Sequence, residues 1–305
     1  MLVGFLILPQ CENFRKDLES KSIVKVCGAY DSMSAKLVEH YGFDAIWAGS
    51  FAISAIHNVP DASILTMTEF FTVASNMAHT CDIPVIADCD TGYGDANNVR
   101  YLVKKYEDAR IAGICIEDKT FPKQNSLLEK GKNQLLAEKD FVAKILAANE
   151  AKQNKAFVII ARIEALISGM GIEQALKRAY AYEKAGADLI LIHSKKITPE
   201  EIFEFSDSWK GSTPLVVIPT TYYSVNIDEL IEHKIKMVIY ANQTLRAAHF
   251  ALSKLLKQMA SADNMSQFQN QMSSMDDIFK LQDMYAMKSQ EKSIEEKLRK
   301  LGYIS

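Results

Sequence analysis

The chain has 305 residues, of which 48% are hydrophobic and 24% are charged, with 35 Lys and Arg against 38 Asp and Glu. A net charge of −3 and a pI near 6.1 leave no surplus of positive charge to bind a phosphate backbone, so we expect no nucleic-acid partner. The longest apolar run, Met1–Leu8, is far shorter than the ~20 residues that cross a bilayer. It also lacks the basic start and the cleavage site of a signal peptide. We therefore expect a cytoplasmic protein without a membrane partner.

Between residues 23 and 260, short β-branched runs alternate with longer segments of helical period. The expected strands are Ile23–Ala29, Ala45–Gly49, Pro84–Asp90, Gly113–Glu117, Ala156–Glu164, Leu189–His193, Pro214–Pro219 and Lys236–Ala241. The expected helices are Ser32–Tyr41, Thr68–Thr80, Asn97–Ala109, Asp140–Lys152, Gly171–Ala185, Pro199–Trp209, Ile227–Lys234 and Thr244–Met259. Strict alternation of strands and helices predicts an α/β fold, a (β/α)8 TIM-type barrel, with a doubly wound open sheet as the alternative.

Two appendages flank these units. Cys11–Ser20 has the pattern of a short N-terminal helix, which we expect to cap the lower mouth of the barrel. A polar stretch, Ser261–Ser274, precedes a helical pattern over Met275–Leu301. We therefore expect a catalytic domain over residues 1–260. Residues 261–305 are expected to form a linker and a C-terminal helix that packs on the barrel or on a neighbouring subunit.

Acidic residues end two neighbouring strands, where the active sites of such barrels lie. Asp88 and Asp90 alternate along the third strand, so both carboxylates are expected on one side, and Glu117 ends the fourth strand. No lysine compensates the three acids in this interpretation, so they favour Mg²⁺, with one direct ligand and the others holding its waters. The structural alternative is a set of helix caps and an ion pair with Arg162.

Cationic groups follow the fifth and sixth strands. Arg162 offers a planar fork for carboxylate or phosphoryl oxygens, and His193 offers a donor. The aperiodic stretch from Lys119 to about Glu138 indicates a lid that delivers Lys123 and Asn125 to a substrate. Together these residues predict an anionic, oxygen-rich small-molecule substrate, although a core histidine and a merely flexible loop are the structural alternatives.

Four sequence motifs at these strand ends resemble the phosphoenolpyruvate mutase family of the isocitrate lyase superfamily. They are Asp88-Cys89-Asp90-Thr91-Gly92-Tyr93-Gly94, Glu117-Asp118-Lys119-Thr120-Phe121-Pro122-Lys123-Gln124-Asn125-Ser126, Arg162-Ile163-Glu164-Ala165 and His193-Ser194-Lys195-Lys196. The second is the most specific, whereas the first marks only the superfamily. The resemblance runs from about residue 12 to the tail helix.

The resemblance implies a barrel whose eighth helix is exchanged between the subunits of a homo-oligomer, a dimer or a tetramer. It also implies Mg²⁺ dependence and the interconversion of phosphoenolpyruvate with phosphonopyruvate, the entry step to natural phosphonates. By motif, Asp88 would ligate Mg²⁺, and Asp90 and Glu117 would hold its waters. The carboxylate of the substrate would be bound by Trp47, Gly49, Ser50 and Phe51. The phosphoryl group would be held by Arg162, His193 and Asn125, with Lys123 on the lid and Asp61 beside the phosphorus.

Other activities of the superfamily remain to be distinguished. Phosphonopyruvate hydrolase shares nearly every motif, but it lacks the lid asparagine that stands here as Asn125. The lyases use a lid cysteine as the acid, whereas this chain reads Lys123-Gln124-Asn125-Ser126 there. The sequence therefore favours the mutase, with the hydrolase as the alternative and a non-catalytic barrel scaffold as a remote one.

Overall fold

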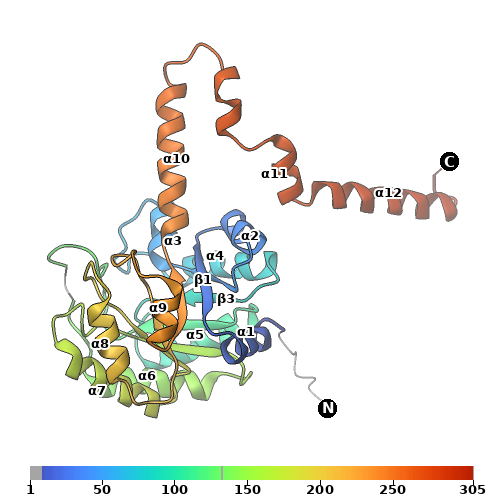
Figure 1. Cartoon of the computed structure of the whole chain (residues 1–305). Coiled ribbons are helices and arrows are strands. Elements are labelled where there is room, and N and C mark those ends of the chain that lie inside the picture. The colour runs from blue at the N-terminus through green and yellow to red at the C-terminus, as the bar shows by residue number, and fades with distance from the viewer. Residues whose placement is uncertain (1–8, 132, 305) are drawn as a thin grey trace. The chain divides into compact units, whose positions relative to one another are not determined.

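The computed structural model describes residues 9–131 and 133–304, and its parallel strands form a closed barrel (Figure 1). The strands are β1 (Val24–Ala29), β2 (Ala45–Ala48), β3 (Val85–Asp88), β4 (Gly113–Glu117), β5 (Val158–Ile163), β6 (Leu189–Ile192), β7 (Leu215–Val217) and β8 (Ile235–Tyr240). Each strand pairs with the next in chain order, and β1 pairs with β8 to close the barrel. The prediction of a (β/α)8 barrel is confirmed, and the open sheet is excluded.

Helix α1 precedes β1, and one or more helices follow each strand along the chain. They are α1 (Pro9–Ser20), α2 (Ser32–His40), α3 (Ser50–Ile56), α4 (Met67–Thr80), α5 (Ala96–Asp108), α6 (Glu138–Ala151), α7 (Gly171–Lys184), α8 (Glu200–Ser208), α9 (Ile227–Glu232) and α10 (Gln243–Met259). Only α3 has no counterpart among the expected helices. Its 7 residues are too short for a periodic pattern, and its N-cap, Gly49, has no side chain to mark the start.

Helix α1 contacts the amino ends of several strands, as expected for a helix that caps the lower mouth. Arg15 donates to the backbone carbonyls of Ala156 and Phe157, the two residues before β5, at 3.1 and 3.2 Å. It also pairs with Asp188, which precedes β6, at 2.6 Å. Cys11 and Phe14 are fully buried beside these contacts. The carboxyl ends of the strands are left as the open face on which a site can form.

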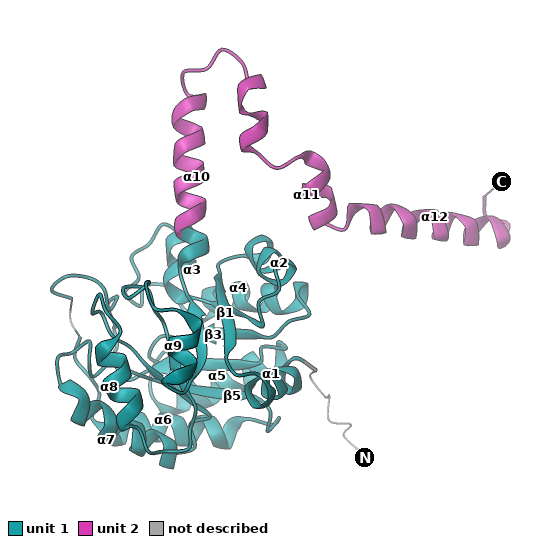
Figure 2. Cartoon of the chain, in the orientation of Figure 1, with its two compact units in different colours: residues 1–245 teal, residues 246–305 magenta. Residues whose placement is uncertain are grey.

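The chain divides into two units, residues 1–245 and 246–305 (Figure 2). Within the second unit, a 3₁₀ helix, η1 (Ser266–Gln271), precedes α11 (Met275–Leu281) and α12 (Met284–Lys300). The prediction of one continuous helix over Met275–Leu301 is wrong, because Asp283 adopts a left-handed φ of 53° and separates α11 from α12. In the described part of the chain, no helix is long and apolar enough to span a membrane. The apolar run Met1–Leu8 lies outside the described residues.

Candidate active site

Three carboxylates gather at the carboxyl ends of β3 and β4. Asp88 is the last residue of β3, and Glu117 is the last residue of β4. The backbone carbonyl of Asp90 accepts a hydrogen bond from the N–H of Glu117 at 2.8 Å. The Ser50 hydroxyl donates to the Asp88 carboxylate at 3.0 Å. The structure therefore brings together the acids that the sequence singled out.

The route by which Asp90 reaches this group differs from the expected one. The strand was expected to continue through Asp90, but β3 ends at Asp88 and Asp90 has a left-handed φ of 49°. Gly92, two residues further on, has a φ of 87°, and a Cβ there would lie 2.6 Å from the Val99 side chain. The chain therefore leaves the strand through a tight turn, in which Asp and Gly tolerate left-handed backbone angles. The prediction that both aspartates share one side of a strand is wrong.

The prediction that no lysine compensates these acids is also wrong. Lys123 Nζ lies 3.1 Å from Asp90 Oδ1, and Lys119 Nζ lies 3.8 Å from Glu117 Oε1. Burial raises the pKa of Asp90 to about 7, and Lys123 offsets this effect only in part. Although burial opposes the charged form of Lys123, the Asp90 and Asp61 carboxylates raise its pKa. Both lysines belong to a loop that folds back over the strand ends, which spacing along the sequence does not reveal.

The donor set fits a divalent cation that keeps much of its hydration. Asp90 Oδ1 and Glu117 Oε1 are buried and accept no hydrogen bond. Among residues 9–131 and 133–304, no group of three or more His, Cys, Asp and Glu side chains is arranged to hold a metal ion. Mg²⁺ commonly binds through one or two carboxylates and retains several waters, so it does not need such a cage. Buried carboxylate oxygens that accept no hydrogen bond are suited to Mg²⁺, although here each also lies within 4 Å of a lysine ammonium group.

The loop after β4 closes onto the segment that follows α3. We call residues 119–126 the lid segment. Lys123 Nζ pairs with Asp61 Oδ1 at 2.6 Å, and Asn125 Nδ2 donates to Asp61 Oδ2 at 2.7 Å. The backbone N–H of Lys123 donates to the Ser63 hydroxyl at 3.1 Å. Asp61, Lys123 and Asn125, which are distant in sequence, thus form one hydrogen-bonded group.

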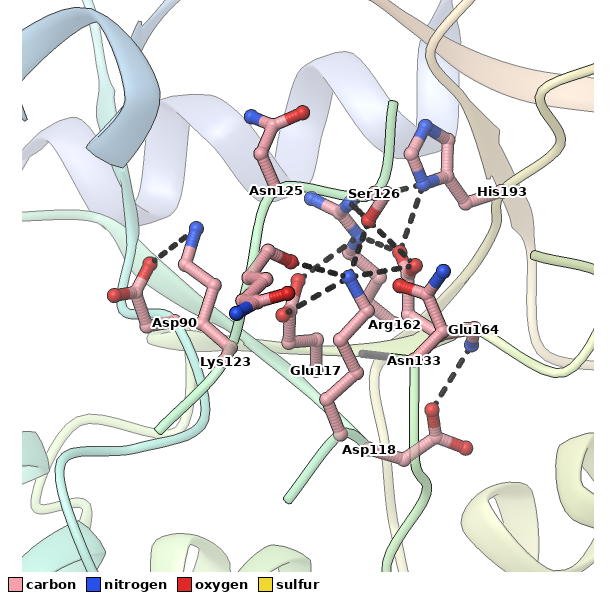
Figure 3. Close-up of polar contacts among 12 residues, drawn as sticks. Asp90, Glu117, Asp118, Lys123, Asn125, Ser126, Asn133, Arg162, Glu164 and His193 are labelled. Atoms are coloured by element: carbon pink, nitrogen blue, oxygen red, sulfur yellow. Dashed lines mark hydrogen bonds and ion pairs between the residues drawn. The ribbon is translucent and has the colours of Figure 1, made fainter. Parts of the chain in front are cut away.

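Arg162 on β5 and His193 after β6 meet at a shared carboxylate (Figure 3). Arg162 Nε donates to Glu164 Oε1 at 2.5 Å, and His193 Nδ1 lies 2.8 Å from the same oxygen. Arg162 Nε also lies 3.4 Å from Glu117 Oε2, so the ion pair between Arg162 and the acids exists as well. His193 Nδ1 also lies 2.9 Å from Arg162 Nη2, so this nitrogen faces both a guanidinium donor and a carboxylate acceptor, and Nε2 lies on the far side of the ring.

The charge states of this group follow from burial and from its neighbours. Burial lowers the pKa of His193, and Arg162 lowers it further, while the Glu164 carboxylate opposes both. Burial disfavours the charged form of Glu164, but Arg162 and His193 hold its pKa well below the usual range. Glu164 is therefore an anion at neutral pH, and the ligand-free imidazole is neutral.

Glu164, Lys119 and Ser126 were not singled out from the sequence as site residues. Ser126 Oγ donates to Glu164 Oε2 at 2.6 Å, and Lys119 Nζ lies 3.3 Å from the same oxygen. Lys119 Nζ also donates to Ser126 Oγ at 2.5 Å. The available signal was the position of Glu164, two residues after Arg162 at the end of a strand. Nothing in the local pattern indicated that Lys119 turns inward.

Asp118 holds the backbone of Glu164 in place. Its Oδ1 accepts the backbone N–H of Glu164 at 2.9 Å. Its Oδ2 accepts Arg178 Nη1 at 3.0 Å and the Tyr182 hydroxyl at 2.7 Å, both from α7. All of these side chains are buried. The outer helix α7 is thereby connected to the backbone of Glu164.

The residues expected to bind a substrate carboxylate lie at the end of β2. Trp47 is buried within β2, and Gly49 is the N-cap of α3. Ser50 is buried at the start of α3, whereas the Phe51 side chain is 40% exposed. The Ser50 hydroxyl is already donated to Asp88, so in this structure it is not directed to a ligand.

Known proteins that share sequence and fold with this chain include phosphoenolpyruvate phosphomutases and a phosphonopyruvate hydrolase. A family model described as phosphoenolpyruvate phosphomutase matches residues 14–260. The phosphoenolpyruvate phosphomutase of Tetrahymena pyriformis is 39% identical over 275 residues, which cover 90% of this chain and 92% of that protein. The crystal structure of phosphoenolpyruvate phosphomutase from Streptomyces platensis subsp. rosaceus has a TM-score of 0.91 and 41% identity, covering 93% of this chain and 98% of that one. A structure of phosphonopyruvate hydrolase in complex with oxalate and Mg²⁺ has a TM-score of 0.87 and 39% identity, covering 92% and 97%.

Fold and site first define the class: a (β/α)8-barrel enzyme whose strand ends carry buried acids facing an arginine and a histidine. The match over residues 14–260 and the identity to its relatives then give the family. The chain belongs to the phosphoenolpyruvate phosphomutase family.

Proposed function

We propose that the protein is a phosphoenolpyruvate mutase that interconverts phosphoenolpyruvate and phosphonopyruvate. The phosphoryl group moves between the enol oxygen and carbon 3 of one three-carbon skeleton, so one O–P bond breaks and one C–P bond forms. The observation that carries this proposal is the hydrogen bond between Asn125 and Asp61 at 2.7 Å, next to the ion pair of Asp61 with Lys123. Asn125 is the residue by which the sequence resembles the mutases rather than the hydrolases.

Three donors are proposed to hold the migrating phosphoryl group. Arg162 offers a guanidinium that binds phosphoryl oxygens in a planar fork. His193 is oriented by the contact of Nδ1 with Glu164, so that Nε2 is free to face the substrate. Asn125 presents an amide from the lid segment. Phosphoryl transfer passes through a loose, metaphosphate-like species, so positioned donors contribute more than covalent chemistry.

Asp61 and Lys123 are proposed to lie beside the transferring phosphorus. Their ion pair at 2.6 Å joins the lid segment to the segment after α3. Closure of this joint would exclude water, which would otherwise divert a metaphosphate-like species to hydrolysis.

The carboxylate end of the substrate is proposed to bind at Trp47, Gly49, Ser50 and Phe51. Because the Ser50 hydroxyl is donated to Asp88, we assign this role to backbone N–H groups of the turn rather than to that hydroxyl. The site for Mg²⁺ is proposed at Asp88, with the other acids, Asp90 and Glu117, holding its waters. When bound, the ion would neutralise negative charge on the enolate oxygen of the substrate.

Phosphonopyruvate hydrolase is the alternative, because a hydrolase structure is nearly as similar as the mutase structure. Incubation with phosphonopyruvate and Mg²⁺, followed by phosphorus NMR, distinguishes the two activities. Phosphoenolpyruvate as the product would support the mutase, whereas inorganic phosphate with pyruvate would indicate the hydrolase. An unchanged spectrum would point to a non-catalytic scaffold. A parallel sample with EDTA tests the dependence on the metal.

We further propose a cytoplasmic homo-oligomer, a dimer or a tetramer. Its catalytic domain would be residues 1–260, and residues 261–305 would pack on the barrel or on a neighbouring subunit. The exposed apolar side chains Phe250, Leu252 and Leu256 on α10 support an exchange of this helix between subunits. Sedimentation of the protein at micromolar concentration would test this proposal, and a monomer would contradict it.

A further inference from the structure

The two oxygens of Glu164 face different parts of the site (Figure 3). Oε1 accepts Arg162 Nε at 2.5 Å and lies 2.8 Å from His193 Nδ1. Oε2 accepts Ser126 Oγ at 2.6 Å and lies 3.3 Å from Lys119 Nζ. The side chain is fully buried, so water does not replace these partners. One carboxylate therefore connects the two phosphoryl-binding groups with the lid segment.

The lid segment is folded around the ammonium group of Lys119. Lys119 begins the segment, and its Nζ donates to the backbone carbonyl of Gln124 at 3.0 Å and to the Ser126 hydroxyl at 2.5 Å. The side chain of Lys119 is only 1% exposed. An ammonium group that is buried without an opposite charge is strongly unfavourable, and Glu164 is the closest carboxylate to it. Glu164 at 3.3 Å is therefore the nearer of two carboxylates that stabilise this ammonium group, the other being Glu117 at 3.8 Å, and Arg162 Nη2 also donates to Ser126 Oγ at 3.2 Å.

The backbone of Glu164 is anchored to the barrel and to α7. Its backbone N–H donates to Asp118 Oδ1 at 2.9 Å, and Asp118 is held in turn by Arg178 at 3.0 Å. The lid segment thus contacts a carboxylate whose backbone is bonded to the barrel. Glu164 also binds the guanidinium of Arg162, so the lid segment and the anion-binding side chains are held by the same carboxylate.

We propose that Glu164 is a positioning residue that orients Arg162 and His193 and, through Oε2, holds the lid segment closed. The inference rests on the proposed function, since it assigns a role within that same site. Glu164 acts through its neighbours and does not touch the substrate. Weakening the Oε2 contacts is expected to slow phosphoryl transfer and to admit water, so that part of the phosphonopyruvate is hydrolysed.

The variant Glu164→Gln tests the lid side of this carboxylate. Arg162 Nε only donates, so the amide oxygen takes the place of Oε1 and the NH₂ group takes the place of Oε2. An NH₂ group cannot accept from Lys119 or Ser126. We expect kcat to fall by about 10- to 100-fold with a smaller change in KM, because a small misplacement of reacting groups acts mainly on the chemical step. We also expect a larger ratio of inorganic phosphate to phosphoenolpyruvate, and faster hydrogen exchange in residues 119–126.

A matched control is available at the other end of the barrel. Glu107 is buried and accepts the backbone N–H groups of Gln153 and Asn154. Glu107→Gln removes a buried carboxylate without touching the site. It is expected to lower the thermal midpoint while the product ratio and the exchange of the lid segment stay at wild-type values.

A second variant, Lys119→Met, removes the lid-side partner and leaves Glu164 in place. It should raise the phosphate ratio and the exchange of the lid segment. The double variant should be less impaired than the product of the two single effects, because both remove the same contact. If Glu164→Gln folds and changes only the thermal midpoint, the proposal is wrong. If that variant does not fold, unchanged exchange and product ratio in Lys119→Met overturn the proposal instead.

The test of the mutase assignment is separate from the test of Glu164. The product made by the wild-type protein decides between mutase and hydrolase. Should the wild type release only phosphate, the mutase assignment fails, whereas the ratio of variant to wild-type kcat and the exchange of the lid segment still decide the role of Glu164.

Discussion

Lys144 on α6 provides a quantitative test of how burial changes the pKa of a charged side chain near the site. Its side chain is 5% exposed, and its Nζ donates to the backbone carbonyl of Thr91 at 2.6 Å, in the turn that carries Asp90. Burial lowers the pKa of Lys144 to about 8, and Asp95 and Asp140 oppose this effect only in part. The folded protein therefore holds an ammonium group that is easier to deprotonate than in the unfolded chain.

The sign and size of the effect follow from linkage. The unfolded chain has the ordinary lysine pKa of 10.5, so between pH 8 and 10.5 it binds more protons than the folded protein. The free energy of unfolding therefore rises with pH across this window. The full gain is about 3 kcal/mol, at 1.36 kcal/mol for each tenfold change in proton affinity. Below pH 8 both states are charged, and the cost of burial is constant.

The substitution Lys144→Met isolates this contribution, since it removes the charge and keeps most of the volume. The free energy of unfolding of the wild type, relative to that of the variant, should rise by roughly 2.5 kcal/mol from pH 7 to pH 10. Urea denaturation at several pH values measures it. Lys139→Met, an exposed lysine on the same helix, controls for the change in net charge. A difference that stays constant with pH to within about 0.5 kcal/mol would refute the reasoning.

Three further outcomes are expected. Asn125→Ala should lower the mutase rate by on the order of 10², as for the loss of a positioned donor, and an unaffected rate in phosphorus NMR would remove Asn125 from the mechanism. Asp88→Ala should abolish Mg²⁺ binding in calorimetric titration, and full retention of binding would place the ion elsewhere. Arg178→Met leaves Asp118 buried without its cation and should lower the free energy of unfolding by roughly 3–5 kcal/mol. Exposed Lys177→Met is the control for it in urea denaturation, and equal losses in the two variants would contradict the argument.

The fold was predictable because strands that are buried on both faces read as continuous apolar runs. Gly113–Glu117, for example, was predicted with the bounds that β4 has, and each of its residues is buried. Elements without such a run were missed or merged. Helix α3 is too short to show a period, and the break between α11 and α12 depends on the backbone angle of a single residue, Asp283.

The site was predictable only as far as strand ends determine it. Asp88 and Glu117 end neighbouring strands, and Arg162 lies at the end of the next, so the topology of a parallel barrel places them together. Partners contributed by the lid segment were not accessible in this way. Lys119 follows Glu117 by two residues and looks like a solvated charge in the sequence. It becomes a buried partner of Glu164 only because the loop folds back over the barrel.

The contacts of α1 bear on the order in which the barrel is completed. Arg15 pairs with Asp188, 173 residues further along the chain, and its carbonyl partners just before β5 lie 141 and 142 residues away. On a growing polypeptide, the helix is made early but its docking surface is not present until β5 and β6 have been synthesised. Closing the lower mouth is thus a late, long-range event, and we expect the helix to be vulnerable to proteolysis until the second half of the barrel has formed.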